Sequence, residues 1–251
     1  TTSDNTAIGD NALGANTAAN NTAVGSAALL ANTTGTENVA VGKGSLDANT
    51  TANEGTAIGY NALGTQVTGN NNTAVGSIAL ATSNGGDDNT AVGRNALGAN
   101  TTASDNTAVG SGALAANTTG SDNTGIGRDA MKANTTGVNN TAVGALALDA
   151  ATTADENTAM GYAALGANTT GSANTAFGAR ALLLNTTTAN NTAIGYYALT
   201  DNVGVYNTAL GSQALFENTT GGSNVAIGAS SLDANTTGGS NTAVGTSALG
   251  A

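Results

Sequence analysis

The amino-acid sequence predicts an all-β fold, a parallel β-solenoid (β-roll) of about fifteen coils, most of them 17 residues long. One phrase, Asn-Thr-Ala-Val-Gly at residues 106–110 in its clearest copy, recurs fifteen times along the chain. The glycines that close it lie 17 residues apart, with two steps of 16. A period this short and constant is typical of a solenoid, in which each repeat packs only on its neighbours. The closing glycines are Gly9, Gly25, Gly42, Gly59, Gly76, Gly93, Gly110, Gly127, Gly144, Gly161, Gly178, Gly195, Gly211, Gly228 and Gly245.

The residues around each closing glycine, which we number as position zero, form regular columns. Position minus one is always apolar and mostly β-branched, as at Val109, which favours a strand. Position plus four is leucine in every copy except Met131. We therefore expect these two columns to form the core of the coil. No apolar stripe with a 3.6-residue period survives across the repeats, so no helix is expected.

Two polar columns belong to the same strand. Side chains alternate between the faces of a strand, so position minus three should share a face with position minus one. It holds threonine in thirteen copies and valine in two, Val39 and Val225. Position minus four is asparagine in every copy except Gly55, and stacked asparagines can hydrogen-bond along the coil axis as a ladder. We expect a structural role for this column, with a ligand role as the alternative.

Position minus two is restricted to small residues, alanine in fourteen copies and Gly125 in the other. An exposed strand position would vary among larger polar residues, so this restriction indicates close approach by another backbone. One hypothesis is that this face of the strand meets a partner chain. The alternative is a flattened coil that is tight on both sides within one chain. The partner-facing candidates are Ala23, Ala40, Ala57, Ala74, Ala91, Ala108, Ala142, Ala159, Ala176 and Ala193.

The remainder of the coil is predicted to be corner and turn. Positions plus one and plus two vary freely, as at Lys43 and Arg94, and are expected to lie exposed. The segment Asn-Thr-Thr-Gly at 117–120, with its equivalents in most coils, predicts a turn because these residue types favour turn conformations. The threonine pair in this turn would form two regular columns of hydroxyl and methyl groups.

The repeated phrase resembles a known motif. Residues 38–42 (Asn-Val-Ala-Val-Gly) and 224–228 (Asn-Val-Ala-Ile-Gly) are similar to the Ser-Val-Ala-Ile-Gly repeat of YadA-like head domains in trimeric autotransporter adhesins. The longer phrase at 191–199 looks like the Asn-Thr-Ala-Ile-Gly repeats of phage tail-fibre and bacterial surface fibre proteins. The resemblance covers the whole chain and implies a left-handed β-roll, commonly homotrimeric, in the stalk or head of an adhesin or fibre. The coil here is longer than in that family, and threonine usually replaces the first valine of the motif.

Composition narrows the chemistry. The net charge of -11 argues against nucleic acid or an anionic membrane as a partner. The chain has no histidine or cysteine, which removes the commonest general base, the commonest metal ligand and cysteine nucleophiles. No glycine loop has the spacing of a phosphate-binding loop, and no apolar run approaches the roughly 20 residues that span a membrane. We expect no enzymatic activity, no cofactor and no metal centre.

Position minus five collects acidic residues in seven of the fifteen copies. Like charges one coil apart could recruit Ca²⁺, but the other copies carry asparagine, serine, alanine or tyrosine there. A solvated acidic edge that discourages lateral aggregation is therefore the favoured interpretation. The acids are Asp4, Glu37, Glu54, Asp88, Asp105, Asp122 and Glu156.

These observations favour a structural role. The chain starts and stops within the repeat, so we expect a single solenoid domain, 1–251, that is a segment of a longer fibre protein or a filament subunit. The leading function is an extracellular fibre or adhesin segment at a cell surface or virion. It would self-associate as a homotrimer or an end-to-end filament, and other regions would contact host surfaces or glycans.

Two further functions compete with the fibre. The alternative is an ice- or ligand-binding solenoid that uses the regular threonine columns. A glycan-binding or enzymatic tailspike is a third class, and it needs aromatic platforms and paired carboxylates. The five tyrosines do not recur in adjacent coils, apart from the neighbouring Tyr196 and Tyr206, which argues against that class.

Overall fold

The computed structural model describes residues 4–250, and this part of the chain is all-β, with fifteen short strands and no helix. The chain divides into two compact units, residues 1–123 and residues 124–251. Each unit is a parallel β-solenoid in which one coil contributes one strand, so the expected fold class is confirmed. The left-handed winding of the solenoid that the family resemblance implies stays a prediction.

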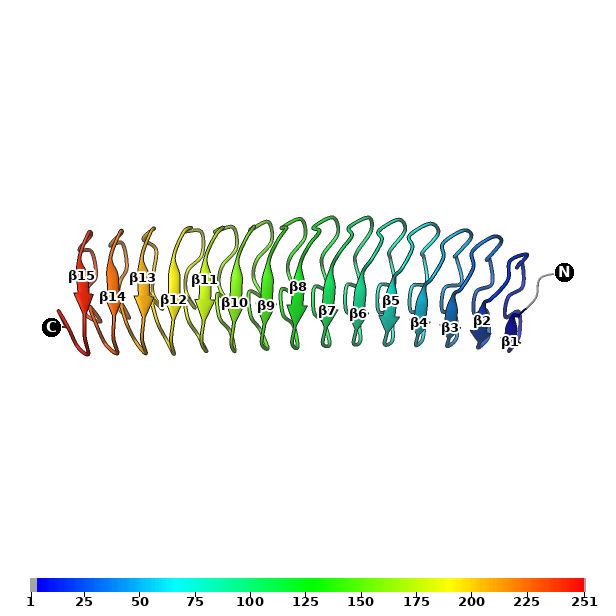
Figure 1. Cartoon of the computed structure of the whole chain (residues 1–251), viewed down its shortest axis with the longest axis horizontal. Helices are drawn as coiled ribbons and strands as arrows, with labels where there is room; N and C mark the ends of the chain where they lie inside the picture. The colour runs from blue at the N-terminus through cyan, green and yellow to red at the C-terminus, as the bar shows by residue number, and fades with distance from the viewer. Residues whose placement is uncertain (1–3, 251) are drawn as a thin grey trace. The chain divides into compact units, whose positions relative to one another are not determined.

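The first unit stacks seven strands side by side in chain order (Figure 1). Each strand pairs in parallel with the next, and equivalent residues face each other, as in Thr90↔Thr107. The same register holds along the unit because every coil repeats the same pattern. The strands are β1 (Thr6–Ile8), β2 (Thr22–Val24), β3 (Val39–Val41), β4 (Thr56–Ile58), β5 (Thr73–Val75), β6 (Thr90–Val92) and β7 (Thr107–Val109).

The second unit repeats this arrangement with eight strands, again parallel and in register (Figure 1). The shorter 16-residue step is absorbed between β12 and β13, where Thr192 still pairs with Thr208. The strands are β8 (Thr124–Ile126), β9 (Thr141–Val143), β10 (Thr158–Met160), β11 (Thr175–Phe177), β12 (Thr192–Ile194), β13 (Thr208–Leu210), β14 (Val225–Ile227) and β15 (Thr242–Val244).

The closing glycine bends the chain as it leaves each strand. These glycines have φ between 128° and 143°, a region that residues with a side chain rarely adopt. A Cβ atom added at Gly93 would lie 2.5 Å from the carbonyl oxygen of Gly110 in the next coil. The column is therefore glycine because both the backbone conformation and the close stacking of coils exclude a side chain.

The interior of the coil is narrow and is filled by three columns of apolar side chains. Alanine at position minus two, alanine or serine at position plus three, and leucine or methionine at position plus four are buried in the coils between the two terminal ones. The leucines have φ between 48° and 55°, in the left-handed region, which turns their side chains inward at the cost of backbone strain. The fully buried large side chains are Leu29, Leu46, Leu63, Leu80, Leu97, Leu114, Met131, Leu148, Leu165, Leu182, Leu199 and Leu215.

The expected asparagine ladder at position minus four is present. The Asn38 backbone N–H and its Nδ2 both donate to Oδ1 of Asn21, at 3.0 and 3.2 Å. The Asn38 Nδ2 also donates to the carbonyl oxygen of Ala52 at 2.9 Å. Since buried amides need partners, this column joins successive coils where backbone pairing alone would leave polar groups unsatisfied.

A second asparagine ladder occupies position plus seven, at the start of the turn. Asn49 Nδ2 donates to Oδ1 of Asn32 at 2.9 Å, and to the carbonyl oxygen of Ala52 at 3.1 Å. The carbonyl of Ala52 thus accepts from both ladders, and the two columns together fix the bend between them. The sequence composition predicted this turn correctly but did not indicate that its asparagine is a second internal ladder.

Candidate interaction surface

The outward side of the strands carries the most regular chemistry on the molecule. In β7 the middle residue, Ala108, has no exposed surface, whereas Thr107 is half-buried and Val109 is 37% exposed. The same pattern recurs in β2–β15: the middle residue of each strand lies inside, and the first and third residues lie outside, whereas all three residues of the terminal strand β1 are exposed. We call the first and third residues of the strands the outer face.

The prediction that position minus one forms the core is therefore wrong. The interior between the walls of the coil accommodates a methyl group from the strand, and the leucines at position plus four supply the bulk. The β-branched residues are displaced to the outside. The residues at position minus one with more than a third of their surface exposed are Ile8, Ile58, Val109, Ile126, Phe177, Ile194, Leu210, Ile227 and Val244.

The alanines expected to meet a partner chain lie inside the coil instead. Each of the ten has no exposed surface in the single chain, so none has area to bury against another molecule. Close approach by another backbone is the correct reason for their small size, but that backbone belongs to the same coil. The corrected residues are Ala23, Ala40, Ala57, Ala74, Ala91, Ala108, Ala142, Ala159, Ala176 and Ala193.

The outer face combines hydroxyl and apolar groups at constant spacing. Seven strands in the first unit and eight in the second each present one threonine or valine beside one apolar residue. Parallel strands lie roughly 4.8 Å apart, so equivalent side chains on neighbouring coils contact one another. Large exposed apolar patches on a protein surface often mark interaction sites.

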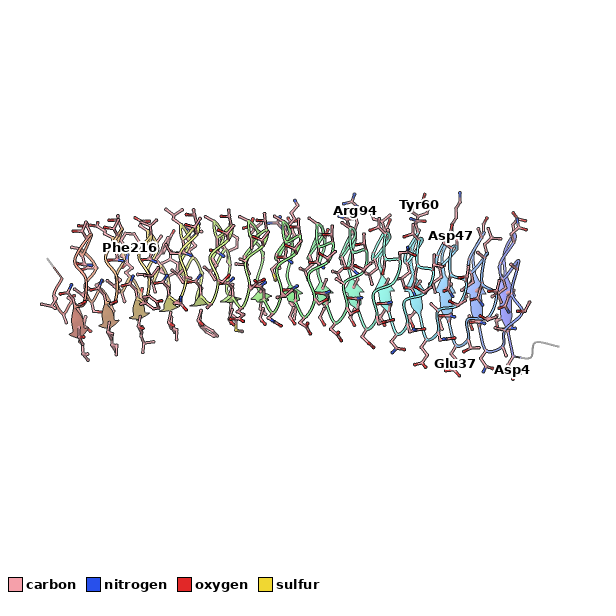
Figure 2. All side chains as sticks on the ribbon, turned by 90° about the horizontal axis from the view of Figure 1, so that it is seen from above. Asp4, Glu37, Asp47, Tyr60, Arg94 and Phe216 are labelled. Carbon is pink, nitrogen blue, oxygen red and sulfur yellow. The ribbon has the colours of Figure 1, made fainter. Side chains whose placement is uncertain are left out.

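The acidic column at position minus five lies on a solvent-exposed edge. All seven acids are exposed and have φ between 56° and 66°, so they occupy a tight bend before the strand. In the first unit, Asp4 and Glu37 project from one edge, and Asp47, Tyr60 and Arg94 project from the opposite edge (Figure 2). Among residues 4–250, no group of three or more acidic side chains is placed to hold a metal ion.

Two other acids, both at position plus five, lie partly within the surface. Burial raises the pKa of Asp47 above the usual range, against the opposing effect of hydrogen bonds from the backbone N–H groups of Asp47 and Ala48. Burial also raises the pKa of Asp149, and the nearby negative charge of Asp129 adds to the shift. Both carboxylates therefore destabilise their coils when ionised.

The threonine pairs lie in the bends, as expected, and the first member of most pairs is engaged through its hydroxyl. Thr101 Oγ1 donates to the carbonyl oxygen of Thr118 in the next coil at 2.9 Å. The same bond recurs at Thr33, which donates to Thr50. The first hydroxyl of the pair therefore ties coils together, and the more regular exposed threonines are those of the outer face.

No protein-family model matches the chain, and a search of curated proteins found no match. The likeness to YadA-like and tail-fibre repeats thus rests on the motif residues themselves. None of the described residues forms a helix long and apolar enough to cross a membrane.

Proposed function

We propose that this chain is a structural segment of an extracellular fibre or adhesin, at a cell surface or virion, and that it works without catalysis. The observation that carries the proposal is the uniform stack within each unit, where strand pairing bonds each coil to the next and two asparagine ladders add bonds between most of the coils. Stability in such an array comes from neighbouring coils, so the same design can be lengthened by adding repeats. A stiff spacer needs this property.

The outer face supports self-association of copies of the chain. A second copy presents the same side chains at the same coil spacing, so apolar residues can meet apolar residues along the whole face. Full burial of a valine or isoleucine is worth about 1.5–3 kcal/mol. Since residues such as Val109 are only partly exposed, each coil stands to gain roughly 0.5–1 kcal/mol on association.

The free energy gained per coil determines how strongly two copies of the chain should associate. Seven coils on each of two copies of the first unit would gain roughly 7–14 kcal/mol. Association costs about 4–15 kcal/mol in lost freedom. Contact over one unit is therefore marginal, and an assembly should depend on concentration and on the length of the repeat array.

Light scattering after size-exclusion chromatography tests this role. We expect the chain to form a discrete oligomer or filament, and the double variant Val75→Lys/Val92→Lys, which charges the outer face of the first unit, to form a monomer. The matched control, Ser77→Lys/Ser111→Lys, charges exposed corner positions and should leave assembly unchanged. Circular dichroism reports whether each variant keeps its strands. A wild-type chain that stays monomeric up to about 1 mM, where a net gain of only about 4 kcal/mol would already populate the assembly, would refute the self-association.

The second candidate is the binding of ice or another ordered surface. The specific observation that favours it is the threonine column on the outer face, which lies on strands, with a methyl-rich column beside it. Such an array could order water at the spacing of the coils. Thermal hysteresis in a monomeric wild-type sample, lost in the same lysine variant, would favour this function over the fibre.

A further inference from the structure

One corner of the second unit departs from the repeated pattern. Positions plus one and plus two hold small or polar residues in most coils, and position plus five is rarely aromatic. Between residues 162 and 216, four aromatic residues occupy these positions, namely Tyr162, Tyr196, Tyr197 and Phe216. Apart from Tyr60 at position plus one, the other coils stack without aromatic residues at these positions, so the fold does not require them.

These rings and one arginine form a contiguous group, which we call the aromatic cluster (Tyr162, Arg180, Tyr196, Tyr197 and Phe216). Tyr197 meets Tyr196 edge to face, with ring centroids 4.5 Å apart, and meets Phe216 in the same manner at 6.0 Å. The Arg180 guanidinium lies 5.8 Å from the Tyr162 ring centroid and 5.2 Å from that of Tyr197. Arg180 also donates a hydrogen bond to the Tyr197 hydroxyl.

The cluster is ordered by these contacts and still open to solvent. Tyr197, which every other member except Tyr162 contacts directly, is half-buried at the centre. Tyr162 and Tyr196 remain 48% and 53% exposed. Rings that are held in place lose little freedom when a ligand stacks on them, which is the condition for a preorganised platform.

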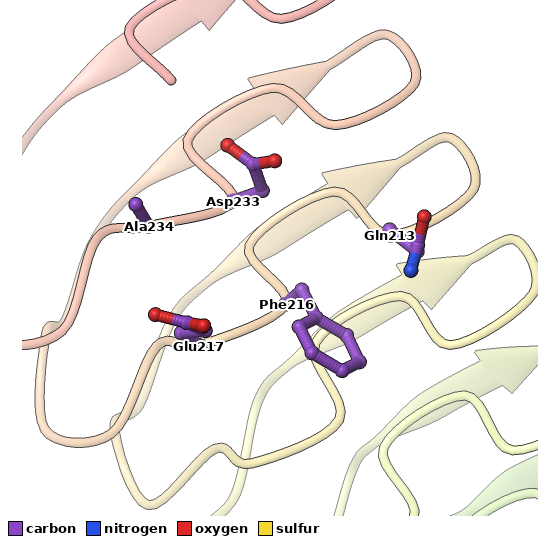
Figure 3. Close-up of a pocket in the computed structure, with 5 residues that line it drawn as sticks. All are labelled: Gln213, Phe216, Glu217, Asp233 and Ala234. Atoms are coloured by element: carbon purple, nitrogen blue, oxygen red, sulfur yellow. The ribbon is translucent and has the colours of Figure 1, made fainter. Parts of the chain in front are cut away.

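A small cavity adjoins the cluster at Phe216. Its volume is about 100 Å³, and it is lined by Gln213, Phe216, Glu217, Asp233 and Ala234. In Figure 3 the Phe216 ring lies between Gln213 on one side and the carboxylates of Glu217 and Asp233 on the other. These three polar side chains make no hydrogen bond to any residue in the described part of the chain.

Exposed aromatic rings beside two carboxylates restrict the class of ligand that this surface can bind. An anion would meet two carboxylates, and a purely apolar ligand would leave them desolvated without partners, which is costly. A ligand with an apolar face and several hydroxyl donors satisfies both parts, because its C–H groups contact the rings and its hydroxyls donate to the carboxylates. The cavity is well below the roughly 300–1,000 Å³ that encloses a whole small ligand, so it suits one substituent of a ligand that lies mainly on the exposed rings.

We propose that the aromatic cluster and its adjoining cavity bind a neutral saccharide, presented as part of a longer glycan. The sugar ring lies against Tyr196 and Phe216, and hydroxyl groups donate to Glu217 and Asp233 within the cavity. This site lies in the solenoid itself and does not depend on the outer face. It therefore stands or falls separately from self-association of the chain.

The test is binding of the purified chain to a panel of neutral, amine-bearing and carboxylated oligosaccharides, followed by calorimetric titration of the best neutral one. We expect Phe216→Leu and Tyr196→Leu, which keep apolar bulk and remove the rings, to raise Kd at least tenfold. Glu217→Gln should weaken binding by a smaller factor, because the amide oxygen still accepts. The matched control is Tyr60→Leu, which removes an equally exposed ring (59%) outside the cluster and should change Kd less than twofold.

Three outcomes would overturn the proposal. One is that no neutral oligosaccharide binds at millimolar concentration. Another is that Tyr60→Leu weakens binding as much as Phe216→Leu, which would place the site elsewhere. The third is binding restricted to amine-bearing sugars and abolished by Glu217→Gln, which would make the cavity a site for a cation. Circular dichroism of each variant separates loss of the site from loss of the fold.

Discussion

Replacing Asn89 by alanine tests the energetic role of the internal ladder. The Asn89 Nδ2 donates to Oδ1 of Asn72 at 3.1 Å and to the carbonyl oxygens of Asp87 and Ala103 at 3.0 and 2.8 Å. Its Oδ1 accepts from the backbone N–H and the Nδ2 of Asn106, at 3.1 and 3.2 Å. The variant Asn89→Ala removes all five bonds from a side chain that has no exposed surface.

The stability lost in Asn89→Ala depends on which hydrogen-bond partners of Asn89 have another partner. The carbonyl of Ala103 still accepts from Asn100 at 3.0 Å, and that of Asp87 still accepts from the backbone of Asp105 at 3.2 Å. The buried backbone N–H of Asn106 has no such replacement. One orphaned buried donor costs about 1–3 kcal/mol, and the weakened bonds around it add about 1–2 kcal/mol. We therefore expect a loss of about 3–5 kcal/mol in the free energy of unfolding.

The assay is urea denaturation followed by circular dichroism, with Asn84→Ala as the matched control. Asn84 lies exposed in a bend of the same unit, and its side chain makes no hydrogen bond within residues 4–250. We expect this control to stay within about 0.5 kcal/mol of wild type. If the two variants unfold at the same urea concentration with the same slope, the ladder is not a source of stability and the reasoning fails.

Three further changes have expected outcomes in unfolding experiments, by urea for the two glycine variants and by heat for the aspartate variant. Gly93→Ala should cost about 3 kcal/mol or more because its Cβ would lie 2.5 Å from the Gly110 carbonyl oxygen, whereas Gly85→Ala, with only an ordinary 3.6 Å contact, should be neutral. Gly55→Asn should stabilise the chain by about 1 kcal/mol by completing the ladder; an unfolding midpoint at or below that of wild type would contradict this. Because burial raises the folded-state pKa of Asp149, its contribution to stability is favourable at low pH and lost as pH rises through that pKa. Asp149→Asn should therefore exceed wild type in Tm at pH 7 and match it below the ordinary aspartate pKa of about 3.9; a difference independent of pH would be the contrary result.

The periodic features of the fold could be predicted from the sequence because the residues responsible for them recur at the same position in each coil. The glycine at position zero, the leucine at position plus four and the asparagine at position minus four each have a single structural reason, and all three columns are where the repeat predicts them. The repeat did not predict which face of the strand lies inside the coil. Alternation assigns Thr107 and Val109 to one side and Ala108 to the other, but it does not say which side is inside.

Hydrophobicity alone predicts the wrong face of the strand to be buried. Val109 is more apolar than Ala108, and a large core would bury it. In this coil the positive φ of Leu114 already turns a large side chain into the interior. The space that remains beside the strand accommodates only the methyl group of Ala108. Volume therefore decides over hydrophobicity, and the restriction of position minus two to alanine or glycine was the signal for it.

The aromatic cluster could not be predicted from the repeat because it breaks it. Arg180 and Tyr197 lie 17 residues apart in equivalent positions of neighbouring coils, and they meet only because those coils stack in register. Phe216 occupies a different position in its coil, and its contact with Tyr197 depends on the path of the corner. The available signal was local enrichment, since four of the seven aromatic residues lie between residues 162 and 216 at corner positions.

The outer face raises a separate question about constancy among the repeats. Interior columns are constant because packing admits one residue type, but the outer face has solvent on one side and no such limit. Corner positions that are equally exposed vary from lysine to tyrosine, as at Lys43 and Tyr60. Strand preference for threonine, valine and isoleucine, with stacking of like side chains worth roughly 0.2–1 kcal/mol per pair, explains part of this constancy. It does not explain why lysine, glutamate and tyrosine are absent from all fifteen strands, since single charged residues on a sheet edge or face are common and aid solubility. A uniform, uncharged face on a chain that carries 16 acidic residues elsewhere is therefore the observation that supports the proposed self-association.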